Sequence, residues 1–99
     1  MKTVTICGSM RFERDMQKIA FILETRYDMS VLQCVYTGGR RPSDADISAL
    51  ERAHFQKIAI SDAVYVVDIG GYIGDQASKE IDYAKSMGKE IIYHSRFGL

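Results

Sequence analysis

The stretch AVYVVDIGG, residues 63–71, decides the fold of this chain. Its first seven residues are nearly all apolar, and many are β-branched, which is typical of a parallel strand covered on both faces. Gly70 and Gly71 then break the run and predict a loop at the carboxyl end of the strand. The chain therefore contains at least one buried strand of a parallel sheet.

The segments around this strand alternate between two hydrophobic periods. Apolar runs predict three more strands, at residues 3–9, 31–36 and 90–95. Helical spacing predicts helices over residues 12–27, from Ser43, Asp44 or Asp46 as N-cap through Ile60, and over 75–87 with Gly88 as the C′ residue.

Four strands alternating with three helices predict an α/β fold, a small flavodoxin-like or Rossmann-like three-layer sandwich. Right-handed crossovers give a four-stranded parallel sheet of order 2-1-3-4, in one domain over residues 1–99. Ligands bind such sheets where the strand order reverses, at the carboxyl ends of strands 1 and 3. We therefore expect CGSMR (7–11) and DIGGYIGD (68–75) side by side at the binding edge.

Composition narrows the classes of partner. Lys and Arg total 13 and Asp and Glu total 13, so no basic footprint for a nucleic acid polymer or an anionic membrane is present. No long apolar segment or signal peptide is visible, and we expect a cytoplasmic protein with a small-molecule partner. Cys7 and Cys34 stand singly, which predicts reduced thiols, no metal site and no cofactor.

The turn CGSMR has two readings. Gly8 permits close backbone approach, a helix N-terminus follows, and Ser9 and Arg11 add a hydroxyl and a guanidinium, so the turn is suited to a phosphate. A plain β-to-α turn with Ser9 as N-cap explains the same residues equally well. Neither the dinucleotide fingerprint nor a Walker loop is present.

Two residues are candidates for catalysis. Glu80 lies early in the third helix, where a carboxylate is favoured by the helix dipole alone. However, Ala77 and Ala84 place its side chain on the small-residue side of that helix, facing the sheet edge, where a desolvated carboxylate can act as nucleophile or acid/base. His54 lies on the apolar stripe of the second helix, which suits either a packed histidine or a cleft residue.

The glycine loop supplies the remaining candidates for substrate binding. Asp68 ends the strand on the ligand side and is placed to accept hydrogen bonds from a sugar or base. Gly70 and Gly71 shape the loop, and Tyr72 is placed either to pack or to stack on a base. Asp75 is most simply an N-cap.

Together, ICGSMRF (6–12) and SDAVYVVDIGGYIGDQASKEIDYAKSMGKEI (61–91) resemble the nucleoside 2-deoxyribosyltransferase-like superfamily, and most nearly its 2′-deoxynucleoside 5′-phosphate N-hydrolases. The resemblance implies a flavodoxin-like fold that dimerises, with Glu80 attacking C1′ of the deoxyribose. It also implies that Ser9 and Arg11 hold the 5′-phosphate. The substrate would be a nucleoside or a nucleotide.

The chain departs from the family pattern at two places. Eight residues before Asp62, where the family carries an aspartate, stands His54, and GDQAS (74–78) replaces a Gly-x-Gly run before the glutamate. The alternative function is therefore that of a non-catalytic protein that binds a nucleotide or an ADP-ribose-like ligand. A third possibility is a structural domain that only assembles with itself or with a larger protein. Exposed sheet edges further predict a homodimer or higher homo-oligomer.

Overall fold

Four parallel strands form one sheet in the order β2-β1-β3-β4, as predicted. The computed structural model describes residues 1–99. The strands are β1 (Lys2–Gly8), β2 (Met29–Leu32), β3 (Ala63–Val67) and β4 (Glu90–Tyr93). All residues of β3 are buried, because the apolar run at its centre is covered on both faces.

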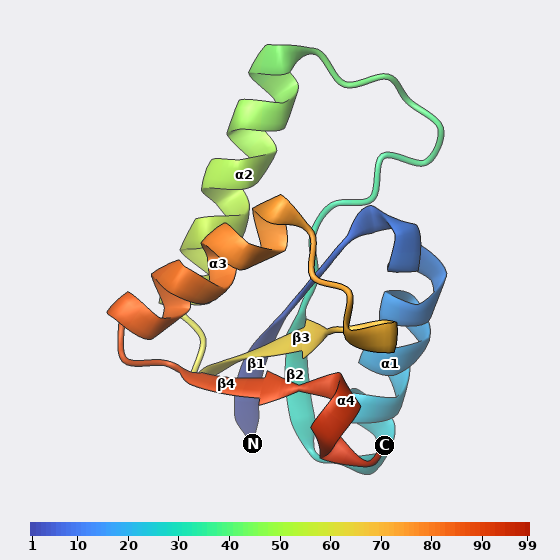
Figure 1. Cartoon of the computed structure of the whole chain (residues 1–99), viewed down its shortest axis with the longest axis vertical. Coiled ribbons are helices and arrows are strands. Elements are labelled where there is room, and N and C mark those ends of the chain that lie inside the picture. The colour runs from blue at the N-terminus through green and yellow to red at the C-terminus, as the bar shows by residue number, and fades with distance from the viewer.

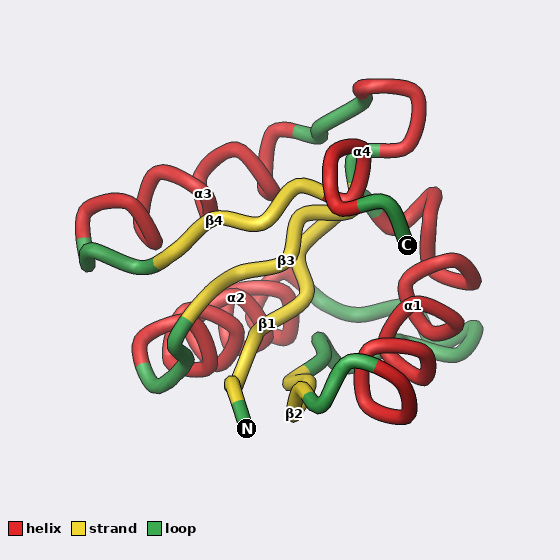
Figure 2. Tube along the Cα trace, turned by 90° about the horizontal axis from the view of Figure 1, so that it is seen from below, coloured by secondary structure: helices red, strands yellow, loops and turns green.

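Helices cover both faces of the sheet. They are α1 (Glu13–Arg26), α2 (Asp44–Ala59), α3 (Asp75–Ser86) and α4 (His94–Phe97), with 3-10 turns η1 (Met10–Phe12) and η2 (Ile69–Gly71). Figures 1 and 2 show α2 and α3 on one side of the sheet and α1 on the other, which confirms the three-layer sandwich. None of these helices has the length and apolar character needed to cross a membrane.

The alternation of side chains along the strands creates two cores. The core under α1 contains Ile6, Leu23 and Tyr65, and the core under α2 and α3 contains Cys7, Ile58 and further apolar residues of β3 and α3. Ile6 and Cys7 are neighbours in β1, so their side chains enter opposite layers. Cys7 therefore points toward the layer that holds α2 and α3.

The second strand is shorter than predicted. The sequence predicted a strand over 31–36, but β2 ends at Leu32, which pairs with Thr5. The backbone then leaves the sheet, and the Gln33 carbonyl accepts a hydrogen bond from Lys57 Nζ at 2.6 Å. This contact joins the end of β2 to α2, and residues 34 and 35 line a cleft instead of extending the sheet.

The fourth strand also ends early, at Tyr93, because residues 94 and 95 begin the unpredicted helix α4. The backbone N–H and hydroxyl of Ser95 donate to Asp68 at 2.8 and 2.6 Å. Tyr65 Oη lies 2.6 Å from His94 Nδ1. These long-range contacts to β3 and the residue after it fold the chain back.

The helix ends confirm two predicted caps and correct a third. Ser43 caps α2 in a reciprocal capping box with Asp46, and Gly88 follows α3 at φ 72°. Asp75 was predicted to be an N-cap, but it is the first residue of α3. The N-cap is Gly74, which has no side chain to accept a hydrogen bond.

Candidate active site

The turn after β1 is tight because Gly8 is closely surrounded. A Cβ at this position would lie 3.0 Å from Met16 Sδ and 3.2 Å from Val67 Cβ. Ser9 then caps η1, accepting a hydrogen bond from the Arg11 backbone N–H at 3.3 Å. Ser9 is therefore an N-cap, one of the two roles that the sequence allowed. Its hydroxyl lies at the edge of the sheet.

The turn and the glycine loop lie side by side, as the strand order predicted. A Cβ on Gly74 would lie 3.7 Å from Ser9 Cβ. The Arg11 guanidinium stacks on Tyr72, with Cζ 3.7 Å from the ring centroid, and Phe12 meets the same ring edge-on. The predicted phosphate-binding residues and the glycine loop thus form one surface.

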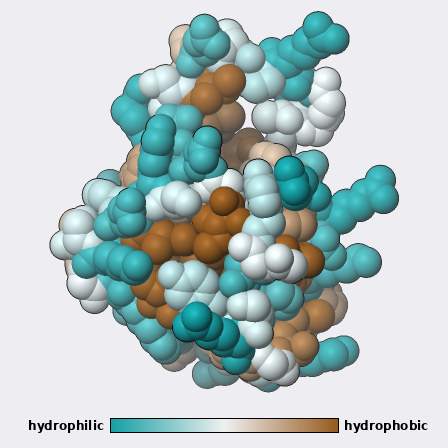
Figure 3. Space-filling view, viewed as in Figure 1, coloured by the Kyte–Doolittle hydropathy of each residue, from teal (hydrophilic) through white to brown (hydrophobic).

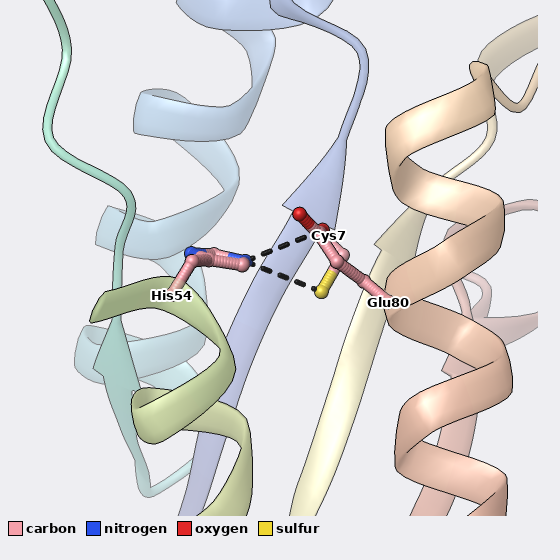
Figure 4. Close-up of side chains that lie close together, drawn as sticks. All are labelled: Cys7, His54 and Glu80. Atoms are coloured by element: carbon pink, nitrogen blue, oxygen red, sulfur yellow. Dashed lines mark hydrogen bonds and ion pairs between the residues drawn. The ribbon is translucent and has the colours of Figure 1, made fainter. Parts of the chain in front are cut away.

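Three buried side chains meet behind this surface, one each from β1, α2 and α3 (Figure 4). His54 Nε2 lies 3.4 Å from Glu80 Oε1 and 3.6 Å from Cys7 Sγ. His54 is 6% exposed and Glu80 is 7% exposed. A carboxylate is therefore held in a nearly dry place, with an imidazole as its neighbour.

The position of Glu80 follows from the face of α3 on which it lies. Ala77 and Ala84, three residues before and four after, are buried on the same face, so Glu80 points inward as predicted. Gln76, one turn earlier, donates its amide N–H to Glu80 Oε2 at 3.4 Å. This bond leaves Oε1 facing His54.

The thiol is the uncharged member of the cluster. Burial, followed by the charge and hydrogen bonding of Glu80, holds the pKa of the Cys7 thiol well above its ordinary value. Cys7 is therefore a neutral thiol beside the carboxylate. The other ring nitrogen of His54, Nδ1, is buried without a hydrogen-bond partner, so contacts at Nε2 decide the tautomer.

A cleft of about 380 Å³ opens beside this cluster, and His54, Glu80 and Gln76 form part of its wall. The rest of its lining is largely apolar, with Met10, Met16, Val35, Ile47 and Leu50, and also includes Thr37 and Glu51. In Figure 3 hydrophobic surface gathers along the outer part of α2, in the hollow that the long loop borders. An apolar cleft with few polar groups at one end is typical of a small-molecule site.

A larger hollow of about 440 Å³ lies over α1, beside Phe21 and Cys34. Its carboxylate, Glu24, already accepts a hydrogen bond from the Val31 backbone N–H at 2.8 Å. It holds no pair of buried ionisable groups like Glu80 and His54. Chemistry therefore favours the cleft at the carboxyl ends of the strands.

Some predicted site residues lie apart from the cleft. Asp68 was expected to bind substrate, but both of its oxygens accept hydrogen bonds from Ser95, so this carboxylate anchors α4. Asp75 is exposed at the start of α3. Gly70, Gly71 and Tyr72 form the exposed glycine loop, with both glycines at positive φ, and are outside the cleft wall.

The structure also adds residues that sequence reasoning missed. Cys34 and Val35 line the cleft because β2 ends early, whereas the apolar run around them indicated a strand. Cys7 joins the cluster through its inward direction on β1. For Gln76 the available signal was its place four residues before Glu80, one helical turn away.

Comparison with known proteins identifies relatives by structure only. No protein-family model matches the chain, and no curated protein matches it in sequence. A 2-deoxyribosyltransferase of Bacillus psychrosaccharolyticus is similar with a TM-score of 0.67 at 11% identity, over 92% of this chain and 70% of that one. The chain shares its fold with this 2-deoxyribosyltransferase.

Two further solved structures share this fold. A 2-deoxyribosyltransferase of Leishmania mexicana has a TM-score of 0.65 at 18% identity, over 94% of this chain and 63% of that chain. The CMP N-glycosidase of Clostridium botulinum has a TM-score of 0.61 at 20% identity, over 93% and 70%. The chain is thus matched almost throughout, while about a third of each neighbour's length has no counterpart in it.

Proposed function

We propose that this protein cleaves the N-glycosidic bond of a nucleoside or nucleoside 5′-monophosphate, or transfers its deoxyribosyl group, with Glu80 as the nucleophile. The observation that carries the proposal is a buried carboxylate, 7% exposed, in the wall of an apolar cleft with His54 Nε2 at 3.4 Å. The fold shared with two deoxyribosyltransferases and a CMP N-glycosidase supports this class of reaction.

In the first step Glu80 Oε1 attacks C1′ of the sugar. The new C1′–O bond forms as the C1′–N bond breaks, and the electron pair of the broken bond leaves with the base. A carboxylate with little hydration needs little desolvation before the attack. The product is a glycosyl ester of Glu80, comparable with the covalent intermediate of retaining glycosidases.

His54 supplies the proton that this step requires. The ring donates a proton to the nitrogen of the departing base, which neutralises the leaving group. In the second step the ring accepts a proton from water or from a second base as that molecule attacks C1′ and frees Glu80. A histidine can serve in both directions, in the place where the family resemblance implies an aspartate.

The surface beside the cleft is suited to a 5′-phosphate. Arg11 stacks on Tyr72 through its planar face, so the N–H groups at its edge stay available for phosphate oxygens. The Ser9 hydroxyl lies next to Gly74 at the start of α3, where free backbone N–H groups also favour an anion. The base would lie against the apolar part of the cleft, toward Val35 and Leu50.

The test is release of free base. The purified protein is incubated with each deoxynucleoside and deoxynucleoside monophosphate, and the products are separated by chromatography. We expect base release by the wild type and none by Glu80→Gln. Asp82→Asn is the matched control, since Asp82 is an exposed carboxylate two residues away on α3 and should leave the rate unchanged.

Three other outcomes would overturn the proposal. Saturable nucleotide binding by calorimetry with the ligand recovered intact would support the alternative of a non-catalytic binding protein. Equal base release by wild type and Glu80→Gln would remove Glu80 from the mechanism. Failure to bind any nucleotide would favour a domain that only assembles.

The homodimer stays a prediction, and so does a cytoplasmic location. Large apolar side chains are exposed around the mouth of the cleft, including Met10 at 53% and Val35 at 58%. A second copy that covers them would deepen the cleft. Light scattering at working concentration tests this, and a monomer would contradict it.

A further inference from the structure

We propose that Cys7, His54 and Glu80 form a zinc-binding site whose occupation excludes attack by Glu80. The sequence predicted no metal site because Cys7 and Cys34 stand singly, without the close spacing of a zinc motif. The fold brings one ligand atom of each within 4.8 Å of the others. Binding of the ion is independent of the proposed function, and only the inhibition rests on it.

Two of the three distances between ligand atoms match tetrahedral coordination, and the third, between Cys7 and Glu80, is within 4.8 Å. Zinc bonds of about 2.3 Å to sulfur and about 2.05 Å to nitrogen, at the tetrahedral angle, separate the two ligand atoms by about 3.6 Å. Cys7 Sγ and His54 Nε2 are 3.6 Å apart. The same construction places nitrogen and oxygen about 3.4 Å apart, and His54 Nε2 lies 3.4 Å from Glu80 Oε1.

The donor set selects the metal. A thiolate, an imidazole and a carboxylate suit zinc, whereas magnesium and calcium prefer oxygen ligands. A thiolate and a carboxylate together carry two negative charges, which balance the two positive charges of the ion. The buried cluster would then be neutral as a unit, with the thiol proton released on binding.

The surroundings fit three protein ligands with one open position. The ligands come from β1, α2 and α3, and each belongs to regular structure. Gln76 orients the Glu80 carboxylate through Oε2, which leaves Oε1 for the ion. Since His54 and Glu80 line the cleft, the fourth position faces it and is open to water or a ligand.

The site is suited to reversible occupation. Metal-bound histidines usually donate their second N–H to a partner, and loss of that partner lowers affinity roughly 10–100-fold. His54 Nδ1 has no partner. A zinc ion on Glu80 would occupy the oxygen that attacks C1′, so the ion and the reaction exclude each other.

Cobalt(II) titration of the whole reduced chain tests the binding without any substrate. We expect a thiolate-to-cobalt charge-transfer band at one equivalent, displaced by zinc and lost in Cys7→Ser. Cys34→Ser is the matched thiol control and should keep the band. Absence of the band from the wild type would overturn the proposal. A band that is lost in Cys34→Ser but kept in Cys7→Ser would overturn it as well.

A second readout guards against a variant that fails to fold. Zinc should raise the melting temperature of the wild type, because the ion binds the folded chain. We expect this shift to vanish in Glu80→Gln, whose side chain is nearly isosteric. An equal shift in wild type and Glu80→Gln would contradict the site.

Inhibition by zinc is tested separately on wild-type protein that releases base. We expect zinc to abolish the release of base and a chelator to restore it. Activity that bound zinc leaves unchanged would overturn the proposed inhibition but not the binding site.

Discussion

Glu80 and His54 face each other across two helices, with Oε1 of the one 3.4 Å from Nε2 of the other and both side chains nearly out of water. In a nearly dry site the interaction between them is stronger than on the surface. Nothing else in the chain places a buried carboxylate beside an imidazole in the wall of a cleft. The predictions about activity follow from this pair.

His54→Asn should lower kcat by about 10²–10⁴-fold, the usual contribution of a general acid/base. The reason is that asparagine cannot deliver a proton to the departing base at an ordinary rate. Single-turnover measurement of base release with a deoxynucleoside monophosphate checks the prediction. A higher KM with kcat unchanged would show that His54 contributes to substrate binding and not to the proton transfer.

A substrate that needs no proton separates the acid role from simple positioning. The base of a 7-methylated purine nucleotide already carries a positive charge in the substrate, so it leaves as a neutral molecule without receiving a proton. We expect His54→Asn to cleave this substrate with a much smaller loss than the unmethylated one. Equal losses on both substrates would mean that His54 acts by holding Glu80 in place.

Gly8→Ala should destabilise the fold by about 1–3 kcal/mol, as overpacking of a filled site does. The added Cβ would meet Val67 Cβ at 3.2 Å and the Val67 carbonyl oxygen at 3.3 Å, besides Met16 Sδ. The Met16 side chain can move, but the backbone of β3 cannot move without disturbing the sheet. Urea unfolding followed by circular dichroism measures the change.

Gly74→Ser is the matched control for that experiment. Gly74 has ordinary negative φ, and the nearest atom to an added Cβ is 3.7 Å away. Serine also supplies the side-chain oxygen that this N-cap lacks, so stability should stay within about 0.5 kcal/mol of wild type. A large loss of stability in both variants would mean that the steric contacts at Gly8 are not what makes its substitution costly.

The sequence predicted the sheet because its signals are local and mutually consistent. The apolar run of β3, the two glycines that break it and the helical stripe of α3 all pointed to one topology, and the strand order followed from the handedness of crossovers. The same topology placed Ser9 beside the glycine loop and turned Glu80 inward. These features can be predicted from the hydrophobic periodicity and the lengths of the connections alone.

Features that depend on a distant partner could not be read from the chain. The Gln33 carbonyl accepts a hydrogen bond from Lys57, and Ser95 donates one to Asp68; each contact lies where the sequence alone predicted a continuing strand. The cluster with Cys7 depends on which residue of β1 faces α2. A shift of one residue along the strand would turn Cys7 into the opposite core.

Asp68→Ala should destabilise the chain by about 1–3 kcal/mol, because it removes the two hydrogen bonds that Ser95 donates to the buried carboxylate. The loss should appear as faster hydrogen exchange over residues 94–97, since these contacts hold α4. Ser95→Ala should have a smaller effect of the same kind. The two changes together should cost less than their sum, as expected for residues in contact. Additive effects would show that Asp68 and Ser95 do not interact, in contradiction to the structure.

Tyr65 should make the fold sensitive to alkali. Burial, and then the nearby charges of Tyr27 and Asp68, raise the pKa of Tyr65 from 10.0 to about 12, and its hydroxyl also contacts His94. A pKa that is higher in the folded than in the unfolded chain means that stability is lost as pH rises from about 10 to about 12. Tyr65→Phe removes this proton, so the fall of the unfolding free energy over that range should become shallower, although Tyr36 and Cys7 still contribute. Urea unfolding at several pH values between 9 and 12 measures the slope. An unchanged slope in Tyr65→Phe would mean that the phenol titrates alike in both states, in contradiction to its buried position.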